Sequence, residues 1–180
     1  MRRLRISLWI IVALAASLFA LFAYQLSQPK DDFVRSAMVG QPLPQFDLEP
    51  AFEGRPGLAT SDFTNGEPQL LNLFGSWCIP CRIEAPQLEA LERAGATVNA
   101  IALRDHSEDV ARFLEVYGNP FARIGSDDIS ETQFALGASG VPETFVIDGS
   151  GRITYQHIGI VTEQDVPLLL DELRRAGSGS

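Results

Sequence analysis

The chain has 180 residues, 46% of them hydrophobic, which is enough apolar material for one globular domain and a short appendage. Three of its 14 basic residues, Arg2, Arg3 and Arg5, precede the first acidic residue, which leaves 11 basic residues against all 23 acidic ones. An acidic surface of this kind repels phosphate backbones, so we expect no nucleic-acid binding. Two cysteines cannot build a framework of several disulfides, so an ordinary core must hold the fold.

The N-terminus predicts a membrane anchor. After the three arginines, residues 6–24 form an uncharged run of 19 residues, and at 1.5 Å per residue this run makes roughly 28 Å of helix, close to the thickness of the hydrocarbon layer. The arginines should stay in the cytoplasm and the rest of the chain should cross. A cleaved signal peptide is the alternative, although its apolar region is usually shorter and Ala13–Ala15 lies in the middle of the run. In a Gram-negative host both interpretations place the domain in the periplasm, and the first makes the chain a single-pass protein of the bacterial inner membrane.

These features divide the chain into four parts. We expect a cytoplasmic start and anchor over 1–24, a polar linker over 25–40, a folded domain over 41–177 and a flexible tail over 178–180.

The first half of the domain alternates strand and helix. Residues 41–63 contain four prolines, which favour short edge strands and turns. "QLLNLF" (69–74) is typical of a buried central strand. Apolar residues at helical spacing then predict a helix that ends at Gly95 and is kinked at Pro86.

The second half continues the alternation and ends in a hairpin. "VNAIAL" (98–103) predicts a second buried strand, residues 107–118 a helix with Ser107 as N-cap, and residues 130–137 a shorter helix. Two strands, 143–148 and 152–158, flank the turn "GSG", and an amphipathic helix covers 162–177. Strand–helix–strand units imply parallel pairs and the hairpin an antiparallel edge, so the predicted fold is an α/β mixed sheet flanked by helices.

The two cysteines lie three positions apart in "WCIPC" (77–81), between a predicted strand and a predicted helix. A thiolate at a helix start receives unpaired N–H groups and the positive end of the helix dipole, which lowers its pKa. Cys78 is therefore the expected attacking thiol, exposed on the surface, and Cys81 the shielded thiol that resolves the mixed disulfide. A half zinc site completed by His106 and His157 and a purely structural bridge are the alternatives.

A second motif, "GVPETF" (140–145), supplies context for the cysteines. Next to a redox pair, the Val141–Pro142 bond is expected to be cis, although "VPE" alone is an ordinary turn. Val141 and Pro142, together with Trp77, are then the candidate substrate-binding residues, with the backbone of Val141 free to pair with an extended segment.

Three polar residues are candidates for adjusting the thiol pKa. Asn72 should turn toward the core beneath the cysteine loop, where it acts on the thiols or satisfies the helix start. Glu143 is either a solvated carboxylate or an acid near Cys78 that raises the thiol pKa. The same two interpretations apply to Glu84, for which the solvated role is favoured.

At this point the sequence resembles the thioredoxin-like, membrane-anchored thiol:disulfide interchange proteins of cytochrome c maturation, the CcmG/DsbE type. The similarity is carried by "LLNLFGSWCIPCRIEAP" and "GVPETFVIDGSGRITYQHIG" and extends from residue 39 through the last helix. It implies a thioredoxin-like fold, Cys78 as attacking and Cys81 as resolving thiol, Pro142 as the cis-proline and Glu143 as an acid close to the site. Thioredoxin itself usually has a buried aspartate where this chain has Asn72, so another acid or water must relay the proton.

The resemblance also implies an activity and its partners. The expected function is a thiol-disulfide oxidoreductase that keeps the Cys-x-x-Cys-His thiols of apocytochrome c, or of its chaperone, reduced for haem attachment. It would be reduced in turn by a membrane thiol carrier, would work as a monomer and would need no metal or other cofactor beyond the Cys78–Cys81 pair. An anchored reductant or oxidant for another exported target, such as copper-site assembly, is the alternative. A thiol peroxidase would require a hydroxyl residue at the position of Gly75.

Overall fold

The computed structural model describes residues 2–27 and 36–178. They form two separate units, a lone helix and a domain, each of which is described by itself. Residues 28–35, which are half of the predicted linker, and the last two residues lie outside the described residues.

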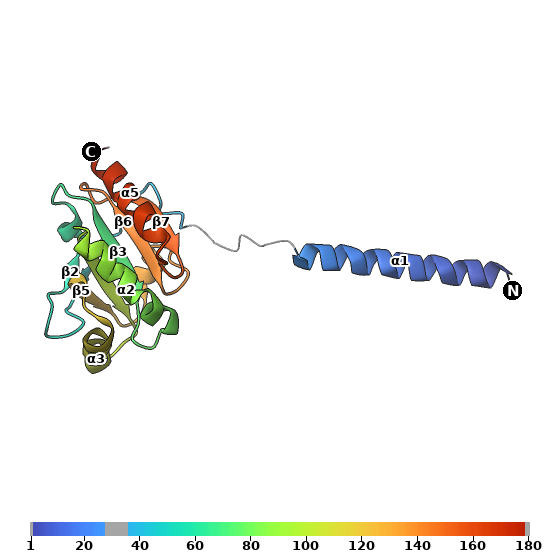
Figure 1. Ribbon diagram of the computed structural model, residues 1–180, viewed down its shortest axis with the longest axis horizontal. Helices are drawn as coiled ribbons and strands as arrows, with labels where there is room; N and C mark the ends of the chain where they lie inside the picture. Colours follow the sequence, from blue (N-terminus) through green and yellow to red (C-terminus); the bar gives the residue numbers. More distant parts are fainter. Residues whose placement is uncertain (1, 28–35, 179–180) are drawn as a thin grey trace. The chain divides into compact units, whose positions relative to one another are not determined.

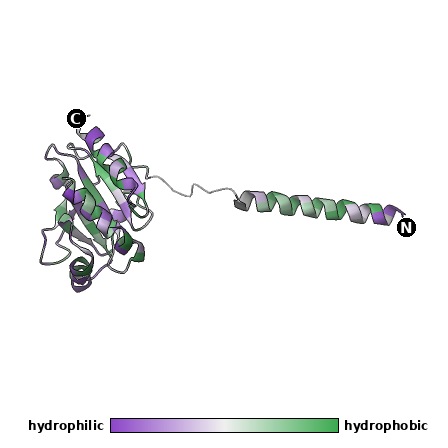
Figure 2. Cartoon of the chain, in the orientation of Figure 1, coloured by the Kyte–Doolittle hydropathy of each residue, from purple (hydrophilic) through white to green (hydrophobic). Residues whose placement is uncertain are grey.

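The N-terminal unit is helix α1 (Arg2–Ser27). Its Arg5–Tyr24 stretch is long and apolar enough to cross a membrane. Figure 2 shows apolar residues along most of α1 and hydrophilic residues at its N-terminal end. Because a bilayer core offers no hydrogen-bond partners to the backbone, a continuous helix is a suitable conformation for such a stretch.

The domain is built on a five-stranded sheet with the order β5-β4-β3-β6-β7 (Figure 1). The strands are β3 (Gln69–Phe74), β4 (Val98–Leu103), β5 (Phe121–Asp127), β6 (Glu143–Ile147) and β7 (Ile153–Ile158). β3 pairs in parallel with β4, and β4 with β5, whereas β3–β6 and β6–β7 are antiparallel. The predicted mixed sheet is confirmed.

Strand β5 was not predicted from the sequence. Its segment, "FARIGSD", alternates between buried and exposed residues irregularly and contains a glycine, so it lacks the clear pattern of β3 and β4. The crossover from β4 through the following helix places β5, parallel to β4, at the edge of the sheet.

Four helices connect or flank these strands. They are α2 (Ile79–Arg93), α3 (Ser107–Tyr117), α4 (Glu131–Ala135) and α5 (Asp165–Ser178). α2 continues through Pro86. The expected N-cap of α3 is wrong by one residue, because the cap is His106 and no side chain bonds to the free N–H groups there.

Two apolar clusters fill the two sides of the sheet. One joins the sheet to α2, α3 and α5 and includes Phe74, Leu91, Phe113, Leu169 and both cysteines. The other includes Leu58, Phe63, Leu71, Phe145 and Leu136, from the opposite face of the sheet and the segments that cover it. Figure 1 shows α5 beside β6 and β7, in agreement with their contacts. The redox motif thus starts a helix that is anchored in a packed core.

The segment before the sheet forms a small hairpin. β1 (Asp47–Leu48) pairs with β2 (Leu58–Ala59), and the 3₁₀ helix η1 (Thr60–Phe63) follows. The predicted short strands and turns are confirmed, and β1 and β2 both contact the edge strand β5.

Candidate active site

Cys78 and Cys81 form a disulfide with an S–S distance of 2.10 Å at the start of α2. Cys78 is the N-cap residue, and its Sγ accepts a hydrogen bond of 3.1 Å from the backbone N–H of Cys81. Pro80 lies in the first turn, where a missing N–H leaves no intrahelical bond unmade. A thiolate at Cys78 would receive this N–H bond and the helix dipole, which stabilise its charge.

The expected exposure of Cys78 is not found in the disulfide form. Cys78 is only 4% exposed and Cys81 2% exposed, because the apolar cluster on the α2 side of the sheet encloses both. Exposure therefore does not separate the two thiols. What separates them is their place on the helix, since Cys78 is the residue that caps it.

Trp77 covers one side of the cysteine loop. Its ring is half exposed, and its Nε1 donates a hydrogen bond of 3.1 Å to the Leu103 carbonyl. A Cβ atom at Gly75 would lie 2.7 Å from that ring. The hydroxyl residue that a peroxidase would require at Gly75 therefore does not fit while Trp77 holds this position.

The Val141–Pro142 bond is cis, as predicted. Val141 is half-buried and packs against both apolar clusters, while Pro142 is buried. Neither the N–H nor the C=O of Val141 has a hydrogen-bond partner among the residues that the structure describes. A short piece of unpaired backbone thus lies directly before strand β6.

Asn72, Glu84 and Thr144 form a buried polar network beneath the disulfide. The Asn72 Nδ2 donates to Glu84 Oε1 and to Thr144 Oγ1, both at 3.0 Å, and the backbone N–H of Val161 donates to Glu84 Oε2 at 3.0 Å. Asn72 lies below the cysteine loop as predicted, but it bonds to Glu84 rather than to the helix start. A cavity of about 10 Å³ is lined by Asn72, Cys81 and Glu84, among others.

The solvated role expected for Glu84 is wrong. The side chain is fully buried, and burial raises its pKa from the ordinary 4.5 to about 7, although the bonds from Val161 and Asn72 act in the opposite direction. A carboxyl group with such a pKa can exchange a proton near neutral pH. It lies one turn beyond Cys81 on the same helix.

Glu143 is also buried, so its solvated alternative is wrong as well. Its Oε1 accepts bonds from the Ser139 N–H and Oγ at 2.7 and 2.6 Å and from the Gly140 N–H at 3.1 Å. Its Oε2 accepts from Gln156 Nε2 at 2.7 Å. These bonds tie the loop before Pro142 to β6 and β7.

Sequence reasoning missed Thr144 and Val161 as partners of the network. Thr144 is found through the strand register, because Asn72 of β3 lies directly opposite Thr144 of β6. That pairing requires the order of the sheet, which no local pattern contains. Within 2–27 and 36–178, no three His, Cys, Asp or Glu side chains converge as a metal site would need.

Comparison with known proteins agrees with this site. The Redoxin family model matches residues 38–173. Over 152 residues the chain is 34% identical to the thiol:disulfide interchange protein HelX of Rhodobacter capsulatus, with 84% of this chain and 85% of the relative covered. Over 156 residues it is 35% identical to the thiol:disulfide interchange protein DsbE of Escherichia coli, with 87% and 84% covered.

The chain belongs to the Redoxin family, within its DsbE/HelX thiol:disulfide interchange branch.

Solved structures of this family have the same fold. The crystal structure of a candidate DsbE from Chlorobium tepidum has a TM-score of 0.66 and 27% identity, and the match covers 77% of this chain and 97% of that one. A secreted thiol-disulfide isomerase from Corynebacterium glutamicum has a TM-score of 0.61 and 29% identity, with 76% and 85% covered. The fold is thioredoxin-like, and the protein is a thiol-disulfide oxidoreductase.

Proposed function

We propose that this protein is a membrane-anchored reductant that keeps the Cys-x-x-Cys-His thiols of apocytochrome c, or of its chaperone, reduced for haem attachment. The observation that carries the proposal is the Cys78–Cys81 pair at the start of α2, in a chain of the DsbE/HelX branch. The WCIPC and GVPETF motifs and an apolar N-terminal helix fit the same role.

The reaction moves two electrons from this protein to its partner. The Cys78 thiolate attacks one sulfur of the partner disulfide, forming a mixed disulfide and releasing the partner's other sulfur as a thiolate, which takes up a proton. Cys81 then loses its proton and attacks Cys78 Sγ, which forms the Cys78–Cys81 disulfide and releases the second partner thiol. The partner gains two electrons and two protons, and a membrane thiol carrier restores the dithiol.

Glu84 is the proposed acceptor for the Cys81 proton. Its carboxyl group shares the small cavity with Cys81, and a pKa of about 7 suits both uptake and release of a proton. Asn72 orients the carboxyl group through its bond to Oε1. This arrangement takes the place of the buried aspartate of thioredoxin.

The partner segment is proposed to lie along Val141. Its unpaired N–H and C=O can form a short strand-like pair with an extended segment. Pro142 and the half-exposed Trp77 border the segment. We further propose that the protein acts as a monomer without a metal or other cofactor, because the two cysteines alone can carry both electrons.

A trapping experiment tests the proposed function. In full-length Cys81→Ala the mixed disulfide through Cys78 has no resolving thiol and should accumulate in cells, whereas Cys78→Ala should capture nothing. Mass spectrometry of the captured partner should identify an apocytochrome c or a Cys-x-x-Cys-His chaperone. Capture of a copper-site assembly protein instead would favour the alternative target, and capture by Cys78→Ala would overturn the assignment of the two thiols.

The direction of electron transfer requires the reduction potential. Thioredoxin-like pairs range from roughly −270 to −120 mV. We expect a value toward the reducing end after prolonged equilibration with glutathione. A value near −120 mV would make the protein an oxidant and exclude the maturation role.

A further inference from the structure

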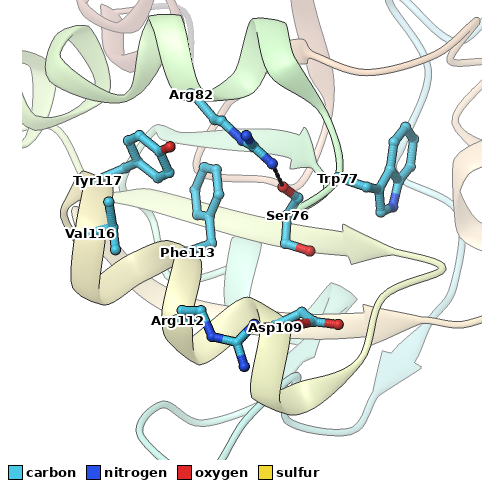
Figure 3. A pocket seen from close by; sticks show the side chains of 8 residues that line it. All are labelled: Ser76, Trp77, Arg82, Asp109, Arg112, Phe113, Val116 and Tyr117. Carbon is cyan, nitrogen blue, oxygen red and sulfur yellow. Dashed lines mark hydrogen bonds and ion pairs between the residues drawn. The ribbon is translucent and has the colours of Figure 1, made fainter.

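A pocket of about 390 Å³ opens beside the redox motif, between the start of α2 and α3 (Figure 3). Ser76 and Trp77, which directly precede Cys78, and Arg82, which directly follows Cys81, line one side. Arg112 and Tyr117 of α3 are among the residues of the other. A segment that delivers a disulfide to Cys78 therefore has this pocket next to it.

The pocket collects positive charge on an acidic protein. The chain has 11 basic residues after Arg5 and 23 acidic residues in total. Two of these basic residues, Arg82 and Arg112, line the pocket. Asp109, the one acidic lining residue, pairs with Arg112 at 3.1 Å on the surface. The lining thus carries two guanidinium groups against one carboxylate.

Arg82 is held in place before any partner arrives. Its Nη2 donates to the Ser76 carbonyl at 2.9 Å, and its guanidinium carbon lies 5.8 Å from the centre of the Tyr117 ring. Figure 3 shows the guanidinium reaching across the pocket toward Ser76. These two contacts fix the group while leaving other N–H donors open, so less side-chain freedom is lost on binding.

Apolar side chains line the same pocket as the two arginines. Val116 is 65% exposed and Tyr117 36% exposed. Because guanidinium groups pair with carboxylates through two parallel hydrogen bonds, and the exposed apolar side chains beside them can pack on methylene groups, the pocket suits an acidic side chain with a short aliphatic stem.

We propose that the pocket bounded by Arg82, Arg112 and Tyr117 binds a glutamate or aspartate side chain of the partner polypeptide, close in sequence to the disulfide being reduced. The inference rests on the proposed function, because it names a feature of the segment that Cys78 attacks. Binding at a pocket lined by Arg82 and Arg112 would let an otherwise acidic protein accept an acidic segment of its partner beside the cysteines.

The test uses matched peptide disulfides. The full-length chain in neutral detergent is reduced with dithiothreitol, which is then removed, and is mixed with Cys-x-x-Cys-His peptides that carry one Glu at successive positions around the disulfide. Each peptide has a partner with Gln at the same position. Acid quenching and chromatography give the rate of peptide reduction for each pair.

We expect at least one position at which the Glu peptide is reduced about two- to five-fold faster than the Gln peptide at low salt. The ratio should fall toward one at 0.5 M NaCl, because salt screens the charges. The double variant Arg82→Gln, Arg112→Gln should abolish the preference. Arg93→Gln, which removes an exposed charge from the far end of the same helix, should retain it.

Three outcomes would overturn the inference. Equal rates at every position would show that no acidic side chain is recognised. If Arg93→Gln lost the preference for Glu as fully as the double variant does, the preference would come from the overall charge of the protein and not from the pocket. In both cases the peptides are still reduced and the proposed function stands; if the wild-type chain reduces no peptide, the proposed function fails and this inference with it.

Discussion

At the scale of single residues, Glu84 and Asn72 place an ionisable group and its partner beneath a redox pair. Glu84 is fully buried, and its two carboxyl oxygens accept bonds from Asn72 and from Val161. The buried Glu84 has the raised pKa that a relay for the Cys81 proton requires.

Replacing Glu84 with Gln should slow the resolving step, because Cys81 then loses its nearby proton acceptor. General acid–base groups contribute on the order of a hundred-fold to such steps, and we expect a decrease of about ten-fold or more at pH 7. The rate of the resolving step is measured directly by starting from a mixed disulfide preformed at Cys78 and quenching the reaction with acid at successive times. Glu163→Gln, an exposed change, serves as control; an unchanged rate in Glu84→Gln would remove Glu84 from the proton path.

The free energy of unfolding should fall as the pH rises through the titration of Glu84. In the unfolded chain the carboxyl loses its proton near its ordinary pKa of 4.5, but in the folded protein only near 7. Between these values the folded state binds the extra proton, so the stability it contributes is complete below about pH 4.5 and is lost by about pH 7. Through this group, the free energy of unfolding below about pH 4.5 should exceed that above about pH 7 by about 3 kcal/mol.

Urea unfolding of the wild type and of Glu84→Gln at a series of pH values measures this difference. The wild-type free energy should decline relative to that of the variant between about pH 4.5 and 7 and stay parallel to it above that range. Parallel curves over the whole series would mean that Glu84 ionises normally in the folded protein.

At the scale of elements, β3 leads into the reactive pair and α2 begins with it, and Val141 of the loop before β6 packs against the same core cluster. Both elements are anchored in the core cluster that contains the cysteines. The loop before β6 is tied by Glu143, which accepts bonds from Ser139, Gly140 and Gln156. The site is thus supported by segments far apart in the sequence, which the sheet brings together.

The packing of the β1–β2 hairpin on the edge strand leads to a stability prediction. A Cβ atom at Gly125 of β5 would lie 2.6 Å from Leu48 Cβ and 3.2 Å from Leu58 Cβ. Gly125→Ala should therefore destabilise the domain by about 1–2 kcal/mol in urea unfolding, because the hairpin must shift away. In Gly140→Ala, where no atom lies within 4 Å of the added carbon, the stability should not fall; an equal loss there would contradict the explanation.

Local sequence patterns predicted most of the helices and strands but not which strands lie next to one another in the sheet. Strands β3, β4, β6 and β7 have uniform or clearly alternating apolar residues next to turn signals, and these are visible in the sequence. Strand β5 is too irregular for that test. The position of β5 at the edge of the sheet is set by the connection through α3, which depends on how the whole sheet is assembled.

The site was predicted to a similar extent. Cys78, Cys81 and the cis bond at Pro142 follow from contiguous motifs. The burial of Glu84 does not, because the residue follows two exposed positions on α2, and its partner Val161 comes from a loop 77 residues away. A carboxylate at such a position is exposed in most helices, and only tertiary contacts decide otherwise.

At the scale of the whole molecule, the chain combines an apolar helix with a catalytic domain. If α1 is an uncleaved anchor, the domain stays near the membrane and meets membrane-bound partners at a raised local concentration. This tethering would favour exchange with a membrane thiol carrier over exchange with freely diffusing proteins.

The orientation of the anchor gives the last prediction. Arg2, Arg3 and Arg5 should keep the N-terminus in the cytoplasm, so a C-terminal alkaline phosphatase fusion should be active, and replacing the three arginines with Glu should lower that activity. The intact mass of the purified protein distinguishes an anchor from a cleaved signal peptide. A fusion that is inactive in the wild type would place the domain in the cytoplasm.

The near-complete burial of the disulfide has a consequence for timing. With only a few per cent of either cysteine open to solvent, small thiols in the surroundings meet the bond rarely. A partner segment that pairs with Val141 as proposed would be held beside the bond at a raised local concentration. Exchange with partner proteins would then set the oxidation state of the pair faster than the surrounding small thiols do.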